Sequence, residues 1–143
     1  MWDKIVKGLA AAGGAVLGWV GGWNVMLTVL AVAMAVDYAT GLIVAACGKS
    51  PKTEGGGLSS KVGFVGLAKK GFILLIVLLA TALDKAIGNQ TMVFQMASAG
   101  YYIANEGLSI MENAALMGVP FPGRLKKALE ELQQSGDEED RTD

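Results

Sequence analysis

Residues 23–47 read WNVMLTVLAVAMAVDYATGLIVAAC, and this stretch decides the class of protein. No charged residue occurs between Lys7 and Asp37, and the sequence after Asp37 stays apolar as far as Cys47. An apolar run of roughly 18 or more residues is a candidate membrane span. At ~1.5 Å per residue, a helix over 23–46 covers roughly 35 Å, which is enough for a hydrocarbon core of about 30 Å. The stretch therefore predicts a membrane protein.

Asp37 interrupts this run. A charged side chain at the centre of a bilayer costs about 2.5–3.5 kcal/mol on insertion scales, so it usually faces other helices or water. We interpret Asp37 as a polar group buried between helices, where it pairs with a lysine or lines water. The alternative is an aspartate at the membrane interface. Thr40 and Gly41 follow one turn later, and they add a hydroxyl and a site of close helix approach to the same face.

The other apolar segments predict an all-α membrane protein with three to four transmembrane helices. Spans are expected at about 23–46, 66–84 and 90–108, with a cytoplasmic loop over 48–65, so that 23–118 form the transmembrane domain. The Gly/Ala-rich segment 1–22 is expected either to cross the membrane as a fourth helix or to lie at its interface. Residues 119–143 form a cytoplasmic segment with a short helix over 125–134 and a disordered acidic tail from Gly136.

Lysines indicate the orientation of these spans. Short cytoplasmic loops carry an excess of lysine and arginine, and lysines are abundant between residues 49 and 70. We expect Lys61, Lys69 and Lys70 at the membrane surface, because a lysine near a helix end can extend its ammonium to water. The loop over 48–65 is then cytoplasmic, the connection near 84–90 is external, and the C-terminus is cytoplasmic.

The last predicted span carries a polar stripe. Its residues recur at spacings of three or four and fall broadly on one side of a helix: Gln95, Ser98, Tyr102, Asn105, Glu106, Ser109, Glu112 and Asn113. In lipid such groups need partners in other helices or in water. For residues 98–105 we expect a buried contact or pore-lining face. For residues 106–113 a solvated surface beyond the membrane is an equal alternative.

Several classes of function are excluded by composition. The chain has no histidine and one cysteine, Cys47, so it contains neither a zinc site of the usual kind nor a Ser-His-Asp or Cys-His nucleophile. Residues 48–50, Gly-Lys-Ser, look like the end of a P-loop, but Ile43 stands where that motif requires glycine. We therefore predict that the protein is not an enzyme, and that it uses no cofactor, metal ion or nucleic acid.

Three blocks of sequence and the chain's close resemble a known family. The blocks are DYATG at 37–41, LSSKVGFVGLAKK at 58–70 and YIANEGLSIMENAA at 102–115, and the close is GVPFP at 118–122 with RLKKAL at 124–129. In this order, and over roughly residues 25–132, they resemble the toxin secretion/phage lysis holin family. The resemblance implies a small phage-encoded, multi-pass protein of the host bacterial inner membrane.

It further implies a homo-oligomer of many copies that opens lesions in the lipid bilayer, so that an endolysin escapes or is activated and the host cell lyses. An endolysin is thus the implied functional partner, and an antiholin is a further one. A holin-like channel that secretes a large protein toxin without lysis, and a small-solute channel, stay open as alternatives. Our candidates for intramembrane polar contacts and oligomerisation are Asp37, Thr40, Gly41, Ser98, Tyr102, Asn105, Glu106, Ser109 and Glu112.

Overall fold

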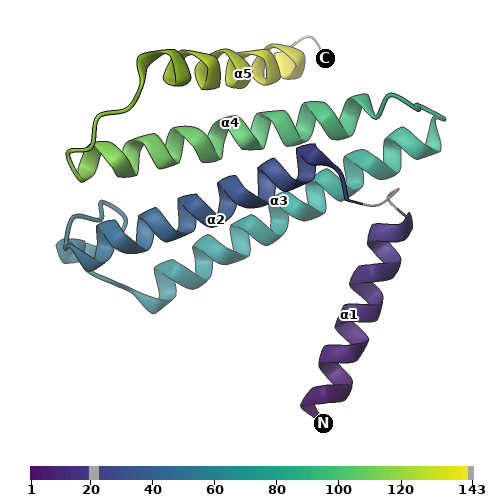
Figure 1. Cartoon of the computed structure of the whole chain (residues 1–143), viewed down its shortest axis with the longest axis horizontal. Helices are drawn as coiled ribbons and strands as arrows, with labels where there is room; N and C mark the ends of the chain where they lie inside the picture. The colour runs from purple at the N-terminus through teal and green to yellow at the C-terminus, as the bar shows by residue number, and fades with distance from the viewer. Residues whose placement is uncertain (20–22, 142–143) are drawn as a thin grey trace.

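The structure is a computed structural model that describes residues 1–19 and 23–141, without the side chains of Leu17 and of residues 138–141. The helices are α1 (Trp2–Trp19), α2 (Val25–Ala46), α3 (Ser60–Ala86), α4 (Val93–Leu116) and α5 (Gly123–Arg141), with a 3-10 turn, η1 (Glu54–Gly56), between α2 and α3 (Figure 1). No strand occurs among the described residues, which confirms the predicted all-α class.

Helices α2, α3 and α4 pack into a bundle. Helix α4 contacts α2 and α3 on one side and α5 on the other (Figure 1). The core of the bundle is small: Leu27, Leu30 and Met34 of α2 meet Val77 of α3 and Ala99 of α4. Helix α1 extends away from the other helices, and its described side chains are exposed. The bundle therefore comprises residues 25–141, and the functional site has to be sought there.

Two helices, α2 and α3, are long and apolar enough to cross a membrane. Little of their most apolar stretches is buried, whereas the core helix of a soluble protein would be mostly covered. Large apolar side chains on their outer surfaces include Val32, Phe72 and Leu75. Because exposure of such side chains to water is unfavourable by roughly 25 cal/mol per Å² of apolar surface, these surfaces suit contact with lipid.

The connection between α2 and α3 is a compact loop over residues 47–59. Three of its glycines have positive φ angles, and Gly56 also lies against the backbone of Gly48, where a Cβ atom would come within 2.2 Å of the carbonyl oxygen. Ser59 then begins α3 by accepting a hydrogen bond from the backbone N–H of Val62 at 3.4 Å. Helix α3 thus begins at Ser60, within the segment 48–65 that was expected as the cytoplasmic loop.

The C-terminal region differs most from its prediction. A short helix over 125–134 and a disordered tail from Gly136 were expected, but α5 continues from Gly123 to Arg141. The expectation of disorder is wrong for residues 136–141, and residues 142 and 143 lie outside the described part. Packing explains the difference, since Leu129 and Gly136 contact α4 and tertiary contacts stabilise helices that composition alone does not.

Candidate functional site

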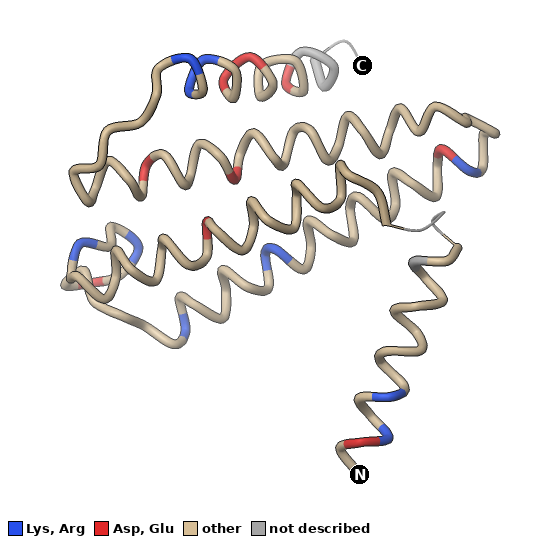
Figure 2. Tube along the Cα trace, viewed as in Figure 1, with Lys and Arg blue, Asp and Glu red and all other residues tan. Residues whose placement is uncertain are grey.

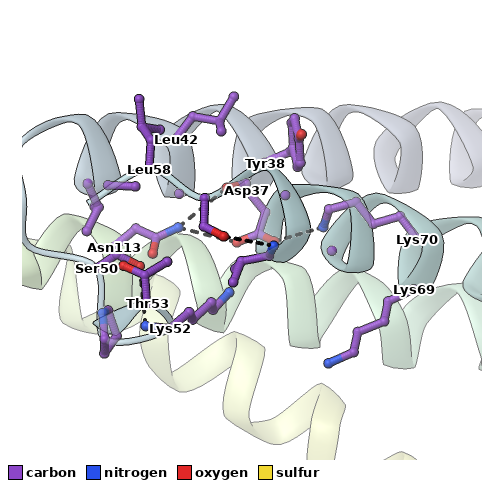
Figure 3. A pocket seen from close by; sticks show the side chains of 18 of the residues that line it. Asp37, Tyr38, Leu42, Ser50, Lys52, Thr53, Leu58, Lys69, Lys70 and Asn113 are labelled. Atoms are coloured by element: carbon purple, nitrogen blue, oxygen red, sulfur yellow. Dashed lines mark hydrogen bonds and ion pairs between the residues drawn. The ribbon is translucent and has the colours of Figure 1, made fainter. Parts of the chain in front are cut away.

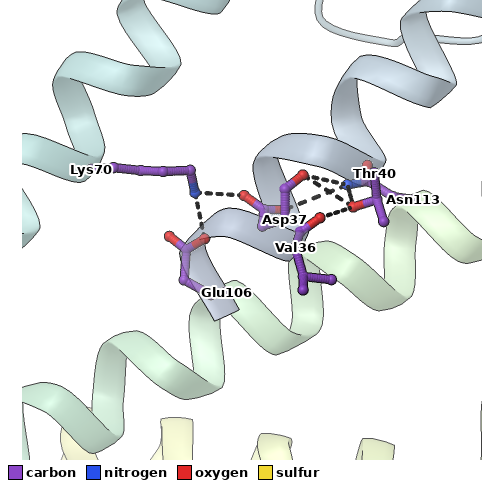
Figure 4. A network of polar contacts seen from close by, with 6 residues as sticks. All are labelled: Val36, Asp37, Thr40, Lys70, Glu106 and Asn113. Carbon is purple, nitrogen blue, oxygen red and sulfur yellow. Dashed lines mark hydrogen bonds and ion pairs between the residues drawn. The ribbon is translucent and has the colours of Figure 1, made fainter. Parts of the chain in front are cut away.

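Three charged side chains from three helices meet inside the bundle. The Nζ atom of Lys70 on α3 lies 2.8 Å from Oδ2 of Asp37 on α2 and 2.5 Å from Oε2 of Glu106 on α4 (Figure 4). These side chains are 13%, 12% and 8% exposed, respectively. One ammonium group thus faces two carboxylates in a largely buried position, and we call this arrangement the Lys70 cluster.

Asn113 extends the Lys70 cluster along α4. Its side-chain amide donates to Oγ1 of Thr40 at 2.9 Å and lies 3.4 Å from both the backbone oxygen and Oδ1 of Asp37 (Figure 4). The Thr40 hydroxyl in turn donates to the Val36 carbonyl at 2.8 Å. Gly41 lies beside this contact, and a Cβ atom there would meet the Asn113 amide nitrogen at an ordinary van der Waals distance of 3.8 Å. The polar groups of α2 and α4 are therefore paired across the interface.

The Lys70 cluster makes it costly in free energy to separate the three helices. Burying an ion pair costs desolvation that can exceed the attraction between the charges, but removing one partner of a buried pair costs about 3–5 kcal/mol. The cluster therefore adds little net stability. Separation of the three helices is nevertheless costly in free energy if it leaves a charged group without a partner and without water. The cost of separation falls where water can replace the missing partner.

A cavity gives water such access. About 260 Å³ of space opens between α2, α3 and the loop over 47–59, and it reaches Asp37, Lys70 and Glu106 (Figure 3). Its walls include Gly41 and Gly63, whose missing side chains leave the space open. A water molecule needs roughly 10–15 Å³ of such volume and two to four polar partners, so the cavity can hold several. The cluster is therefore hydratable from the loop end.

A second buried polar cluster lies at the opposite end of the bundle. The carboxylate of Asp84, which is fully buried, accepts hydrogen bonds from the backbone N–H groups of Phe94 at 3.0 Å and Gln95 at 2.8 Å. It also accepts one from the Asn89 amide at 3.1 Å. Asp84 thus satisfies donors at the beginning of α4, where negative charge is stabilised by the helix dipole.

Gln95 joins this second cluster to the other helices. Its amide nitrogen donates to Thr81 of α3 at 2.9 Å, and its oxygen accepts from Asn24 at 2.9 Å. Asn24 also begins α2 by accepting from the backbone N–H of Leu27 at 3.0 Å. We call the group of Asp84, Thr81, Gln95 and Asn24 the Asp84 cluster; it joins the beginnings of α2 and α4 to the end of α3.

The structure brings some predicted residues together and separates others. Asp37, Thr40, Gly41 and Glu106 converge at the Lys70 cluster. Lys70 was expected at the membrane surface with Lys61 and Lys69, but its ammonium lies between helices, whereas the other two lysines are exposed. Lys70 lies inside α3, which extends from Ser60 to Ala86, and Figure 2 shows a blue segment within this helix that is separate from the blue segments near its two ends.

The predicted polar stripe divides between two faces of α4. Gln95, Glu106 and Asn113 point toward α2 and α3, where each has a hydrogen-bond partner. Asn105 points to the opposite side and accepts a hydrogen bond from Gln133 of α5 at 2.7 Å. The remaining members are partly buried (Ser98, Tyr102, Ser109) or exposed (Glu112).

Sequence reasoning did not predict the Asp84 cluster, because position 84 was interpreted only as the end of the span expected at about 66–84. A usable signal was present, because Asp84 lies shortly before a Gly88-Asn89 turn and the start of the next helix. A carboxylate placed in that way can turn back and bind the first backbone N–H groups of the following helix.

Comparison with known proteins gives the family context. The family model described as the Bacteriophage holin family matches residues 14–134. This range extends further toward the N-terminus than the blocks of resemblance in the sequence, and it includes residues 14–19 at the end of α1. No solved structure gives a significant match.

Individual relatives agree with the family match. A Clostridium perfringens protein, named an uncharacterized 14.9 kDa protein in the nagH 3' region, is 41% identical over 120 residues, which cover 83% of this chain and 86% of the relative. Lin0175 of Listeria innocua, an uncharacterized protein, is 36% identical over 132 residues, 91% of this chain and 89% of its own. A protein of Bacillus phage phi105 named probable holin is 33% identical over 108 residues, covering 76% and 74% of the two chains.

Proposed function

This chain belongs to the bacteriophage holin family, and from that premise we propose that it oligomerises in the host bacterial inner membrane and forms lesions there. The lesions allow an endolysin to leave the cytoplasm or become active, and the host cell then lyses. The structural observation that carries the proposal is the Lys70 cluster, because it combines buried charges from three helices with a cavity that water can fill.

In the proposed topology α2, α3 and α4 each cross the membrane. The lysine-containing loop between α2 and α3 is cytoplasmic, as is the C-terminus, in agreement with the lysine bias of the sequence. Helix α4 is the least apolar of the three, but its polar groups toward α2 and α3 have partners within the bundle. Internal pairing is the condition under which polar side chains are tolerated at membrane depth.

In this proposal the Lys70 cluster holds α2, α3 and α4 together until copies of the chain assemble. While the three helices are together, the ammonium of Lys70 compensates Asp37 and Glu106, and the outer surfaces of α2 and α3 contact lipid. One chain with three or four spans cannot enclose a protein-sized hole, so a lesion requires many copies. As copies assemble, the helices separate at the cluster, and water from the cavity replaces the lost ion pairs.

Inducible expression in bacteria with and without an endolysin tests this function. We expect an abrupt loss of respiration at a set time after induction, with release of folded cytoplasmic protein, and rapid lysis only when the endolysin is present. Cells that carry the empty vector are the control. If the chain accumulates in the membrane while respiration continues, the proposed function is wrong; leakage of small dyes alone would favour a small-solute channel.

A further inference from the structure

Two lysines at the cavity between α2, α3 and their connecting loop have no carboxylate partner among the described side chains. Lys52 of the loop and Lys69 of α3 line this space and are exposed, and neither belongs to an ion pair of the described residues. Lys70 also lines the cavity, but its ammonium faces Asp37 and Glu106 in a largely buried position. Figure 3 shows all three lysines among the lining side chains. The outer part of the cavity is therefore basic.

The charge of the lining groups complements one singly charged anion. Three lysines and two carboxylates line the cavity, so their formal charge is +1. Within the Lys70 cluster one ammonium serves two carboxylates, so one of the two outer lysines balances the cluster and the other remains in excess. A phosphodiester carries one negative charge and matches this excess, whereas a phosphate monoester carries about 1.5–2 at neutral pH.

Hydroxyl groups at the same cavity supply hydrogen-bond donors. Ser50 and Ser59 line it, and their oxygens accept hydrogen bonds from the backbone N–H groups of Lys52 at 3.3 Å and Val62 at 3.4 Å, respectively. Within the described structure neither hydroxyl donates, so each hydrogen can turn toward an oxygen of a ligand. Ser59 also begins α3, whose N-terminus carries a partial positive charge. We call Ser50, Lys52, Ser59 and Lys69 the basic mouth.

Exposed apolar side chains lie beside the basic mouth. Leu42 of α2 and Leu58 of the loop also line the cavity, and they are 41% and 66% exposed. Helices α2 and α3 pack mainly on α4 and touch each other little, and both contribute to the cavity, which therefore opens outward between them. The opening thus places ammonium and hydroxyl groups next to apolar surface, as a phospholipid places a charged headgroup next to acyl chains.

The basic mouth lies at the level of lipid headgroups in the proposed topology. Helix α3 has 27 residues, whereas a hydrocarbon core of about 30 Å takes up only roughly 20 residues of helix. With Ala86 at the external boundary, the core begins near Gly66. Ser59 and the loop then lie in the cytoplasmic headgroup region. Lys69 lies about one turn deeper, and because helical side chains tilt toward the N-terminus, its ammonium extends toward that region.

We propose that the basic mouth binds the headgroup of one anionic phospholipid, whose acyl chains leave the cavity between α2 and α3. The ammonium groups of Lys52 and Lys69 face the phosphodiester, and the two serine hydroxyls donate to headgroup oxygens. Basic pockets between membrane helices on the cytoplasmic side favour such headgroups. A soluble anion would use the same charges but would leave Leu42 and Leu58 in water. The proposal rests on the proposed function in one respect, namely that α2 and α3 span the membrane with a cytoplasmic loop.

Lipid binding is measured on the full chain in nonionic detergent after removal of cellular lipid. Phosphatidylglycerol, or phosphatidylethanolamine with the same acyl chains, is added, and native mass spectrometry counts the lipid molecules on each chain. We expect one phosphatidylglycerol per chain, with half-saturation at a concentration at least about tenfold lower than for phosphatidylethanolamine, since two lysines act on the anionic headgroup. Equal half-saturation by the two lipids would overturn the proposal.

A matched pair of double substitutions tests the lysines. Lys52→Gln with Lys69→Gln removes both ammonium groups of the basic mouth, whereas Lys49→Gln with Lys61→Gln removes the same charge from exposed lysines that do not line the cavity. We expect the first pair to raise the half-saturating phosphatidylglycerol concentration by about tenfold and the second by less than about twofold. All four lysines are exposed, so both variants should keep the thermal stability of the unsubstituted chain in lipid-free detergent. Equal weakening by both pairs would assign the attraction to general surface charge and overturn the proposal.

A second matched pair fills the space without changing the charge. Gly66 lines the cavity and Gly71 does not, although a Cβ atom at either residue of α3 would meet no neighbouring atom within 4 Å. Gly66→Leu should therefore occupy part of the cavity and raise the half-saturating phosphatidylglycerol concentration by about tenfold, whereas Gly71→Leu should leave it within about twofold. Equal binding by these two variants would overturn the cavity as the lipid site.

Inorganic phosphate distinguishes the lipid from the free anion. We expect a large excess of phosphate to leave the bound phosphatidylglycerol in place, and its displacement by phosphate would overturn the lipid as the ligand. None of these measurements requires a lesion. Absence of lipid binding would therefore overturn this inference while the proposed function stands, whereas continued respiration in induced cells would contradict the function while selective lipid binding stands.

Discussion

The two buried polar clusters compensate their buried carboxylates in different ways. At the Asp84 cluster the carboxylate is satisfied mainly by backbone N–H groups of α4 and by the Asn89 amide, all within eleven residues along the chain. At the Lys70 cluster the carboxylates depend on one ammonium, which is 33 residues from Asp37 and 36 from Glu106. The first arrangement forms with the α3–α4 hairpin, whereas the second exists only while three helices remain together.

This difference indicates which end of the bundle opens. Separation of α2 and α3 at the Lys70 cluster breaks side-chain contacts that water from the adjoining cavity can replace. Separation of α3 and α4 at the Asp84 cluster would leave the backbone N–H groups of Phe94 and Gln95 without their acceptor, and Gln95 is buried. We therefore expect the Asp84 end to stay closed during assembly and the loop end to open. The following predictions test that comparison, in order of decreasing expected effect.

Removal of the shared ammonium should have the largest effect. Lys70→Ala leaves Asp37 and Glu106 buried, adjacent and uncompensated, and we expect it to lower the free energy of unfolding by about 3–5 kcal/mol. Thermal or denaturant unfolding of the protein in detergent micelles measures this. The matched control is Lys69→Ala, which alters the exposed neighbour and should change stability by less than about 0.5 kcal/mol. Similar losses for both variants would mean that the cluster does not hold the helices together.

Loss of the Asp84 carboxylate should have the next largest effect. Asp84→Ala removes the acceptor of the backbone N–H groups of Phe94 and Gln95; the Gln95 group is buried, and an unsatisfied buried donor costs about 1–3 kcal/mol. We expect hydrogen exchange to accelerate at these two amides, while the time of lysis in induced cells shifts less than in Lys70→Ala. If Asp84→Ala changes the time of lysis more than Lys70→Ala does, the bundle opens at the Asp84 end and not at the loop end.

Truncation of a neutral contact next to the Lys70 cluster should have a smaller effect. Thr40→Val removes the acceptor that Asn113 uses, and a typical hydrogen bond contributes about 0.5–1.5 kcal/mol. A double-mutant cycle with Asn113→Leu measures the coupling between the two positions. Strict additivity of the two free-energy changes would show that this contact does not support the cluster.

The smallest effect is expected at a solvent-exposed ion pair. Lys126 and Glu130 of α5 lie 3.9 Å apart and are about half exposed, so Lys126→Ala should change stability by at most about 0.5 kcal/mol, and less at high salt. Unfolding measured at low and high ionic strength checks this. If Lys126→Ala lowered the free energy of unfolding as much as Lys70→Ala, burial would not explain why the Lys70 ion pairs matter more than the exposed pair.

Composition alone was enough to predict a helical membrane protein. The apolar runs predicted the segments that became α2 and α3, because a charge-free stretch of sufficient length is a local property of the chain. The isolated charge of Asp37 within such a run likewise indicated a buried polar contact. The sequence blocks, taken in order, identified the family that the comparisons then showed.

The partners of the polar groups were decided only by the tertiary structure. Lys70 looked like a surface residue beside Lys69, because nothing local distinguishes two adjacent lysines that point in directions about 100° apart on a helix. Asn105 and Glu106 are neighbours in sequence, yet they serve opposite faces of α4. Helix α5 extends past Gly136 because α4 lies beside it. Hydrophobicity is read residue by residue, whereas the pairing of a buried charge depends on the rotation and register of helices distant in sequence.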